Sequence, residues 1–339
     1  MFYIITASAD TYITNKILQN KFRATDANVG RAGTLDLFKL YDESRFTQNG
    51  TVVTSSVSEL TRILLKFDYD DVVALTSSSL DINSDSFKAE LRLSEVKTGA
   101  PVPRNFRVVA NPLAVSFAEG SGRSTSQFSD VDAANFVTSS IVSGTPALWN
   151  VTGSGQGGYL GSSGIDYITS GSIGGEEIDF GSSFFFNEGP GDLILDVTKQ
   201  VSSSLANDMV NHGFRIAFSG SDESDTKTRF AKRFLSRHSR NKLLVPRILL
   251  TWDDSIQDRH LDLQFNVSSS LFLKNFISGR PANLVSGSSL TELTGENCAN
   301  LRFVSGSGKP TETTFNVNVS QHTGSTTGAG MVGVYSGTF

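Results

Sequence analysis

Cysteine and long apolar runs are nearly missing from this chain, and their scarcity excludes several classes of protein. The single cysteine, Cys298, excludes an internal disulfide framework. No stretch approaches the ~18 consecutive apolar residues of a membrane-spanning helix, so we expect no membrane insertion. The opening Met-Phe-Tyr-Ile-Ile-Thr has neither the basic nor the apolar region of a signal peptide, so we expect none.

The charge balance is unfavourable for direct contact with nucleic acid. The chain carries 29 Lys and Arg against 34 Asp and Glu, which gives a net charge of −5. Its 24 Phe supply ample material for a core and exclude simple disorder. At 339 residues the length favours two domains, since one domain takes about 150 residues.

Motifs for catalysis or for cofactor and metal binding are also missing. The four histidines lie far apart in sequence, and Cys298 has no Cys-x-x-Cys partner, so we expect no metal site. The glycine-rich segment 153–161 does not fit a phosphate loop, and no helix pattern follows it. Acidic groups at 68–71 and 222–225 offer oxygen ligands for calcium, but both are interpreted as solvated turns. We therefore expect no catalytic residues and no cofactor.

What the sequence does contain is the alternation of β-strands. Ile63, Leu65 and Phe67 alternate with more polar neighbours, and a period of two buries one face of a strand. Turn-forming Ser, Gly, Asn and Asp separate the strands, which favours an antiparallel sandwich. One helix is predicted after Asp196, with Val197, Val201 and Leu205 on one face. The predicted strands are 2–6, 35–41, 62–67, 87–93, 106–110, 178–186, 214–218, 230–234, 247–252, 261–267, 271–276, 300–304, 313–320 and 331–339.

A charged segment, residues 253–260, interrupts this pattern after Trp252. It contains little apolar material and separates one set of strands from another. We therefore predict one β-sandwich domain over residues 1–252, a linker over 253–260 and a smaller β domain over 261–339.

The most unusual charge feature is a basic stripe between residues 227 and 247, which contains no acid. Opposite charges steer and orient association, so the stripe is a candidate docking surface for an acidic partner; the alternative is a hairpin with a solvated basic face. Strand alternation predicts that Arg229 and Arg233 point one way and Lys232 the other. We therefore expect exchange of both Arg229 and Arg233 for Glu to leave the isolated fold intact but to weaken incorporation into a particle. The stripe consists of Lys227, Arg229, Lys232, Arg233, Arg237, Arg240, Lys242 and Arg247.

Several short motifs together resemble DNRLRE-type domains, over roughly residues 5–252. They are Ala9-Asp10-Thr11, Asn28-Val29-Gly30, the strand Arg62–Asp68, Ser236-Arg237-His238 and Pro246–Trp252. Where the family commonly has Ser-Arg-Glu, this chain has His238 in the third position. The resemblance implies a jelly-roll-like β-sandwich similar to carbohydrate-binding modules.

With the charged segment Trp252–Asp258 and the closing segment Gly333–Phe339, the whole chain also resembles structural proteins of contractile-tailed phages of marine and cyanobacterial hosts. In these a DNRLRE-like domain is followed by a charged linker and Ig-like β domains. The resemblance implies a non-enzymatic virion protein at the neck or tail, assembled in the host cytoplasm as a homo-oligomer with other virion proteins. The alternative is a glycan-binding adhesion or decoration module for a host surface, in which Trp149, Tyr159 or Tyr167 stacks on sugars.

Overall fold

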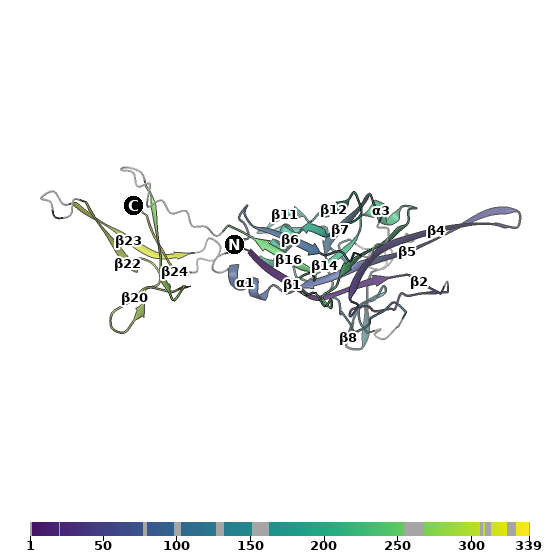
Figure 1. Cartoon of the computed structure of the whole chain (residues 1–339), viewed down its shortest axis with the longest axis horizontal. Coiled ribbons are helices and arrows are strands. Elements are labelled where there is room, and N and C mark those ends of the chain that lie inside the picture. The colour runs from purple at the N-terminus through teal and green to yellow at the C-terminus, as the bar shows by residue number, and fades with distance from the viewer. Residues whose placement is uncertain are drawn as a thin grey trace. The chain divides into compact units, whose positions relative to one another are not determined.

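The protein is all-β, as the strand periodicity predicts, with antiparallel sheets (Figure 1). The structure is a computed structural model that describes residues 2–19, 21–76, 80–97, 103–126, 132–150, 163–253, 268–305, 308, 313–323 and 330–338. None of the helices in these ranges is long and apolar enough to cross a membrane.

Two compact units make up the chain. The first contains Phe2–Tyr69 and Lys88–Thr251, and the second contains Asp70–Phe87 and Trp252–Phe339. The segment Asp70–Phe87, which the sequence-based boundary places in the first domain, is thus grouped with the second unit. The linker predicted at 253–260 stays a prediction, because residues 254–260 lie outside the described part of the chain.

The first unit is built on a large antiparallel sheet in the order β12-β7-β14-β5-β1-β16-β6-β13, to which β4 and β15 are added beside β5. Two short helices, α2 (Thr198–Leu205) and α3 (Gly220–Ser224), belong to the same unit. The strands of the first unit are β1 (Phe2–Thr14), β2 (Ile17–Leu18), β3 (Phe22–Arg23), β4 (Thr34–Gln48), β5 (Thr51–Phe67), β6 (Lys88–Leu93), β7 (Phe106–Pro112), β8 (Thr138–Val142), β9 (Thr145–Leu148), β10 (Ser170–Ile173), β11 (Glu176–Asp179), β12 (Ser182–Phe186), β13 (Leu193–Asp196), β14 (Phe214–Phe218), β15 (Arg229–Leu235) and β16 (Arg247–Thr251).

Strand β1 joins the two parts of this sheet, because its first half pairs with β16 and its second half pairs with β5. A bulge between Ala7 and Ala9 marks the change of partner. Beyond the bulge, Asp10 and Ile13 are both buried. Ile13 packs in a core cluster that includes Leu64, Phe136 and Trp149.

The second unit has one helix, α1 (Asp70–Thr76), and a four-stranded sheet in the order β17-β24-β23-β22. Tyr335 is fully buried there, and its hydroxyl donates to the carbonyl of Leu293 and accepts from the amide of Leu284. The strands of this unit are β17 (Ser270–Lys274), β18 (Phe276–Ile277), β19 (Arg280–Pro281), β20 (Val285–Ser286), β21 (Thr291–Glu292), β22 (Ala299–Ser305), β23 (Thr313–Thr323) and β24 (Gly330–Thr338).

The predicted helix is confirmed as α2, with Val197, Val201 and Leu205 buried. The carboxylate of Asp196 accepts the amide of Thr198 at 2.9 Å, so it satisfies one of the free amides at the helix start. The predicted strand 178–186 is two strands, because the chain turns at Phe180-Gly181 between β11 and β12. The predicted strand 261–267 lies outside the described residues.

Candidate functional site

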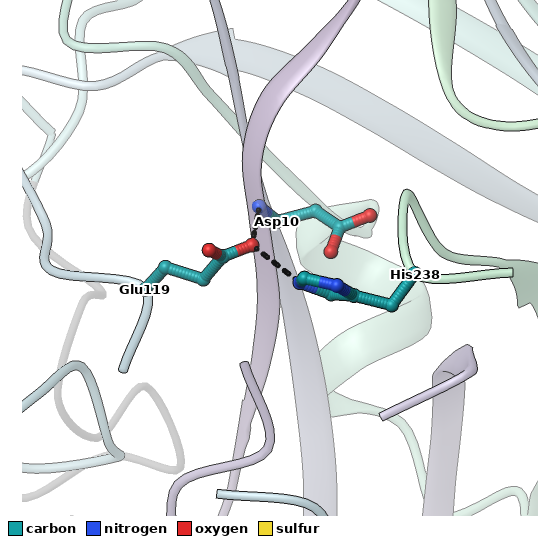
Figure 2. A group of neighbouring side chains, drawn as sticks. All are labelled: Asp10, Glu119 and His238. Carbon is teal, nitrogen blue, oxygen red and sulfur yellow. Dashed lines mark hydrogen bonds and ion pairs between the residues drawn. The ribbon is translucent and has the colours of Figure 1, made fainter. Parts of the chain in front are cut away.

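Asp10, Glu119 and His238 come together from distant parts of the first unit (Figure 2). Asp10 lies on β1, Glu119 lies in the connection between β7 and β8, and His238 follows β15. Each offers a ligand-type atom, and these atoms lie within 4.8 Å of one another. The neighbouring Arg237 completes the group by an ion pair with Glu119.

Asn28 and two glycines hold the Glu119 backbone in place. The side-chain Nδ2 of Asn28 donates to the carbonyl of Glu119 at 2.8 Å, and its side-chain Oδ1 accepts from the backbone amides of Gly30 and Gly122. A Cβ at Gly30 would lie 1.9 Å from the carbonyl oxygen of Glu119, and one at Gly122 would lie 2.0 Å from that of Asn28. Glycine is therefore required at both positions, because the two backbone segments approach too closely to leave room for a side chain.

Three of the motifs that carry the DNRLRE resemblance meet here. Asp10, the Asn28–Gly30 segment and the Ser236-Arg237-His238 segment all surround Glu119. The Ser236-Arg237-His238 segment contains no acid, and Arg237 forms its ion pair with Glu119, which comes from another part of the chain. Sequence reasoning missed Glu119, and no spacing or motif marks it.

Glu119 accepts four hydrogen bonds. Arg237 donates to both of its oxygens, from Nε at 2.6 Å and from Nη2 at 2.8 Å. The amide of Asp10 donates to Oε1 at 3.0 Å, and His238 Nε2 lies 3.2 Å from the same oxygen. Burial alone would raise the pKa of Glu119, but the hydrogen bonds from Arg237 and Asp10 outweigh it and lower that pKa.

Asp10 is in the opposite situation. Its side chain is almost completely buried, Oδ2 accepts the amide of Arg237 at 2.5 Å, and Oδ1 has no hydrogen-bond partner among the described residues. Burial raises the pKa of Asp10 from 3.8 to about 7. The hydrogen bond from the Arg237 amide and the Arg237 charge lower this pKa, and the negative charge of Glu119 raises it further. The group thus pairs one ionised carboxylate with another that takes up a proton near neutral pH.

The arrangement is better suited to joining loops than to holding a metal ion. Asp10, Glu119 and His238 are ligand types, but both oxygens of Glu119 are already bound by the Arg237 guanidinium. A second cation would compete with that guanidinium and be repelled by it. What the geometry does provide is a cross-link between β1, the segment after β7 and the segment after β15.

The basic stripe is largely neutralised within the chain. Arg229 pairs with Asp222 at 2.8 Å and with Asp225 at 2.7 Å, and it is buried. Lys232 is fully buried, donates to Glu95 Oε1 at 2.5 Å and lies 4.6 Å from the centre of the Phe186 ring.

The other residues of the stripe are more accessible. Arg233 pairs through two hydrogen bonds with Asp36, and its side chain is 41% exposed. Lys227, Arg240 and Lys242 are exposed, and Lys242 donates to the carbonyl of Arg237. Arg247 is half-buried and donates to the carbonyl of Leu243. The docking surface that the stripe still offers is therefore concentrated at Lys227, Arg240 and Lys242.

The predicted orientation of the stripe is wrong. A bulge between Arg229 and Lys232 breaks the alternation of β15, so both of these side chains are buried while Arg233 reaches solvent. Given this buried position, we now expect the exchange of Arg229 for Glu to destabilise the fold. Such an exchange would place a buried carboxylate beside Asp222 and Asp225.

Helix α3 and the following Asp225 supply the acids that bind Arg229 and three other buried cations of the first unit. Asp222 and Asp225 bind Arg229, and Asp225 also binds the buried Lys39 on β4 at 2.7 Å. Glu223 accepts from the fully buried Arg62 at 2.9 Å and lies 3.6 Å from Arg215. The acids interpreted from the sequence as a solvated turn are thus the counter-ions of a buried cluster.

The aromatic residues considered for sugar stacking differ in their surroundings. Trp149 is buried in the core, and its Nε1 donates to the carbonyl of Asn135 at 2.9 Å. The Arg215 guanidinium lies 4.5 Å from the centre of the Tyr167 ring, so one face of that ring is covered. Tyr159 lies outside the described residues.

No protein-family model matches the chain, and no curated protein matches it either.

Proposed function

We propose that this chain is a non-enzymatic structural protein of a phage particle, placed at the neck or tail, that works through protein–protein contacts. The similarity to structural proteins of contractile-tailed phages motivates this proposal. The structural observation that carries it is the hairpin of β4 and β5, whose outer part is exposed on both strands (Figure 1). We call residues 42–57 of this hairpin the arm.

The arm receives little stabilisation from the rest of its own domain. Seven residue pairs, from Asp42 with Val57 to Gln48 with Thr51, join its two strands. The described part of β15 pairs with β4 only as far as Lys39, and β1 pairs with β5 only from Thr61 onward. A two-stranded hairpin is at best marginally stable in water by itself. An arm held away from the core in this way is suited to contact with a neighbouring molecule in an assembly.

The glycan-binding alternative has weaker support. A sugar-stacking site needs an open aromatic face, but Trp149 is buried and Tyr167 is covered on one side by Arg215. The two aromatic candidates within the described residues therefore do not form an open platform.

The test is to purify particles of the phage that encodes the chain and to quantify their proteins by mass spectrometry. We expect the chain at a fixed copy number that matches the symmetry of a neck or tail ring. Gold-labelled antibodies should then decorate the neck or tail in electron micrographs. Absence of the chain from washed particles, or labelling confined to host membranes, would overturn the proposal.

A further inference from the structure

The arm has two open edges that differ in chemistry. On the β5 side, residues Thr51–Ser58 read Thr-Val-Val-Thr-Ser-Ser-Val-Ser and contain no charge, proline or glycine. On the β4 side the arm carries Asp42, Glu43 and Arg45. Natural proteins protect exposed edge strands with charges, prolines or bulges, because a bare edge pairs with other strands. The β5 edge lacks all three protections over this stretch.

Nothing in the described part of the chain pairs with the β5 edge between Thr51 and Val57 on the side away from β4. The open stretch ends at Ser58, whose carbonyl accepts from Arg23 at 3.2 Å. The turn at Asn49-Gly50 has positive φ at both residues, as in a two-residue type I′ hairpin. Gln48 and Thr51 then form a hydrogen-bonded pair, and the amides of Val52, Thr54 and Ser56 point to the open edge.

We propose that this edge pairs with the same edge of a second copy of the chain, antiparallel and about a two-fold axis, to form a four-stranded sheet across the contact. Identical strands place identical residues near one another, so charges on them would repel. Thr51–Ser58 is free of that penalty, whereas the charged β4 edge is not. The absence of charge on β5 therefore favours a copy of this chain over a partner recognised through charge.

The side chains of the arm agree with this pairing. Phe46 and Val53 are directly opposite each other, so they share a face, and Phe46 is 48% exposed. A two-fold axis perpendicular to the sheet brings this face of both copies to the same side. The two Phe46–Val53 pairs would then extend one apolar surface across the four strands.

This inference builds on the proposed function, since copies repeated in a particle need a contact with one another. It is tested on the whole purified chain, by sedimentation velocity over a range of concentrations. We expect the wild type to form dimers as concentration rises. Thr54→Lys places like charges near each other in the pairing strands and should raise the dimer Kd by roughly tenfold or more.

Two further variants make the test specific. Thr54→Pro removes an amide that points to the open edge and adds no charge, so it should weaken the dimer as well. Thr47→Lys adds the same charge to the other strand of the arm and should leave dimerisation unchanged. Far-ultraviolet circular dichroism checks that each variant keeps the wild-type fold.

Wild-type protein that stays monomeric up to its solubility limit would overturn the inference, as would Thr54 variants that dimerise normally. Equal loss in Thr47→Lys would overturn it too, because the contact would then use the β4 edge. A chain that is found in particles but fails this test refutes the self-pairing edge alone. A chain that passes this test but is missing from particles refutes the virion role alone.

Discussion

At Asp10 the fold buries a carboxyl group and leaves one of its oxygens, Oδ1, without a hydrogen-bond partner in the described structure. Its neighbour Glu119 is buried less and is bound by Arg237 through both oxygens. The difference in their pKa values follows from this contrast, because burial without donors favours the protonated form and donors favour the ionised form. The pKa values of two acids in one cluster are therefore shifted in opposite directions.

We predict that Asp10 makes the protein less stable as the pH rises. Its pKa is raised from 3.8 to about 7 in the folded state, so its stabilising contribution is complete below pH 3.8 and is lost as the pH rises through 7. The loss is on the order of 4 kcal/mol between the two limits. Asp10→Asn keeps an oxygen for the Arg237 amide and cannot ionise, so its stability should depend much less on pH.

Urea unfolding of both proteins at pH 5 and pH 8 checks this prediction. The exposed Asp26 provides a matched control, since Asp26→Asn makes the same chemical change without affecting a buried group. An equal fall in stability for wild type and Asp10→Asn between the two pH values would show that Asp10 does not cause the dependence.

The basic stripe gives a second prediction for single residues, because it contains buried and exposed arginines of the same strand. Arg229→Gln leaves Asp222 and Asp225 without their main partner in a buried cluster and should cost about 3–5 kcal/mol. Arg233→Gln breaks the more exposed pair with Asp36 and should cost less than about 1 kcal/mol. Thermal or urea unfolding of the two variants measures the difference, and equal costs would contradict the buried position of Arg229.

Among the elements, the segments that connect strands decide how the Glu119 cluster is built. The turn between β3 and β4 brings Asn28 and Gly30 against the backbone of Glu119. This contact leaves no space for a Cβ at Gly30, but nothing lies within 4 Å of a Cβ at Gly33 in the same turn. The two glycines therefore have different roles despite their closeness in sequence.

We predict that Gly30→Ala is strongly destabilising and that Gly33→Ala is nearly neutral. The added methyl at position 30 forces backbone to move away from backbone, which costs about 1–3 kcal/mol or more. Differential scanning calorimetry of the two variants makes the comparison directly. A similar melting temperature for both would mean that the approach of Gly30 to Glu119 is not as close as described.

The hairpin arm shows where strand prediction fails. The sequence predicts strands over 35–41 and 62–67, but β4 extends to Gln48 and β5 begins at Thr51. Alternation of apolar and polar residues arises only where one face of a strand is buried. The arm is exposed on both strands, so its residues carry no such alternation, and periodicity does not detect it.

On the scale of the whole molecule, the described sheets account for the two groups of strands seen in the sequence. Contacts divide the chain between Thr251 and Trp252, with Asp70–Phe87 added to the second unit. The linker prediction over 253–260 can be tested by limited proteolysis. Trypsin should cut first at Arg259, since the segment around it is charged and has little apolar content. Initial cleavage within residues 60–67, inside β5, would refute the predicted linker.

The predicted docking role of the basic stripe belongs to the scale of the assembled particle. Lys227 and Arg240 are exposed, so Lys227→Glu with Arg240→Glu should leave the isolated fold intact and reduce incorporation into particles severalfold. Gel quantification of purified particles measures the effect, and added salt should weaken wild-type assembly as well. Normal incorporation of the double variant would make the stripe an ordinary surface.

The sequence alone determined the all-β fold and helix α2, because strand alternation and helical spacing are local patterns that each segment carries by itself. Which charges are paired depends instead on how the strands assemble. Arg237 pairs with Glu119, which is 118 residues away in the sequence, and Lys232 pairs with Glu95, which is 137 residues away. No local pattern encodes such partners, since they meet only when the sheets assemble. The bulge in β15 adds to this, because one extra residue sends Arg229 inside against the alternation of its strand.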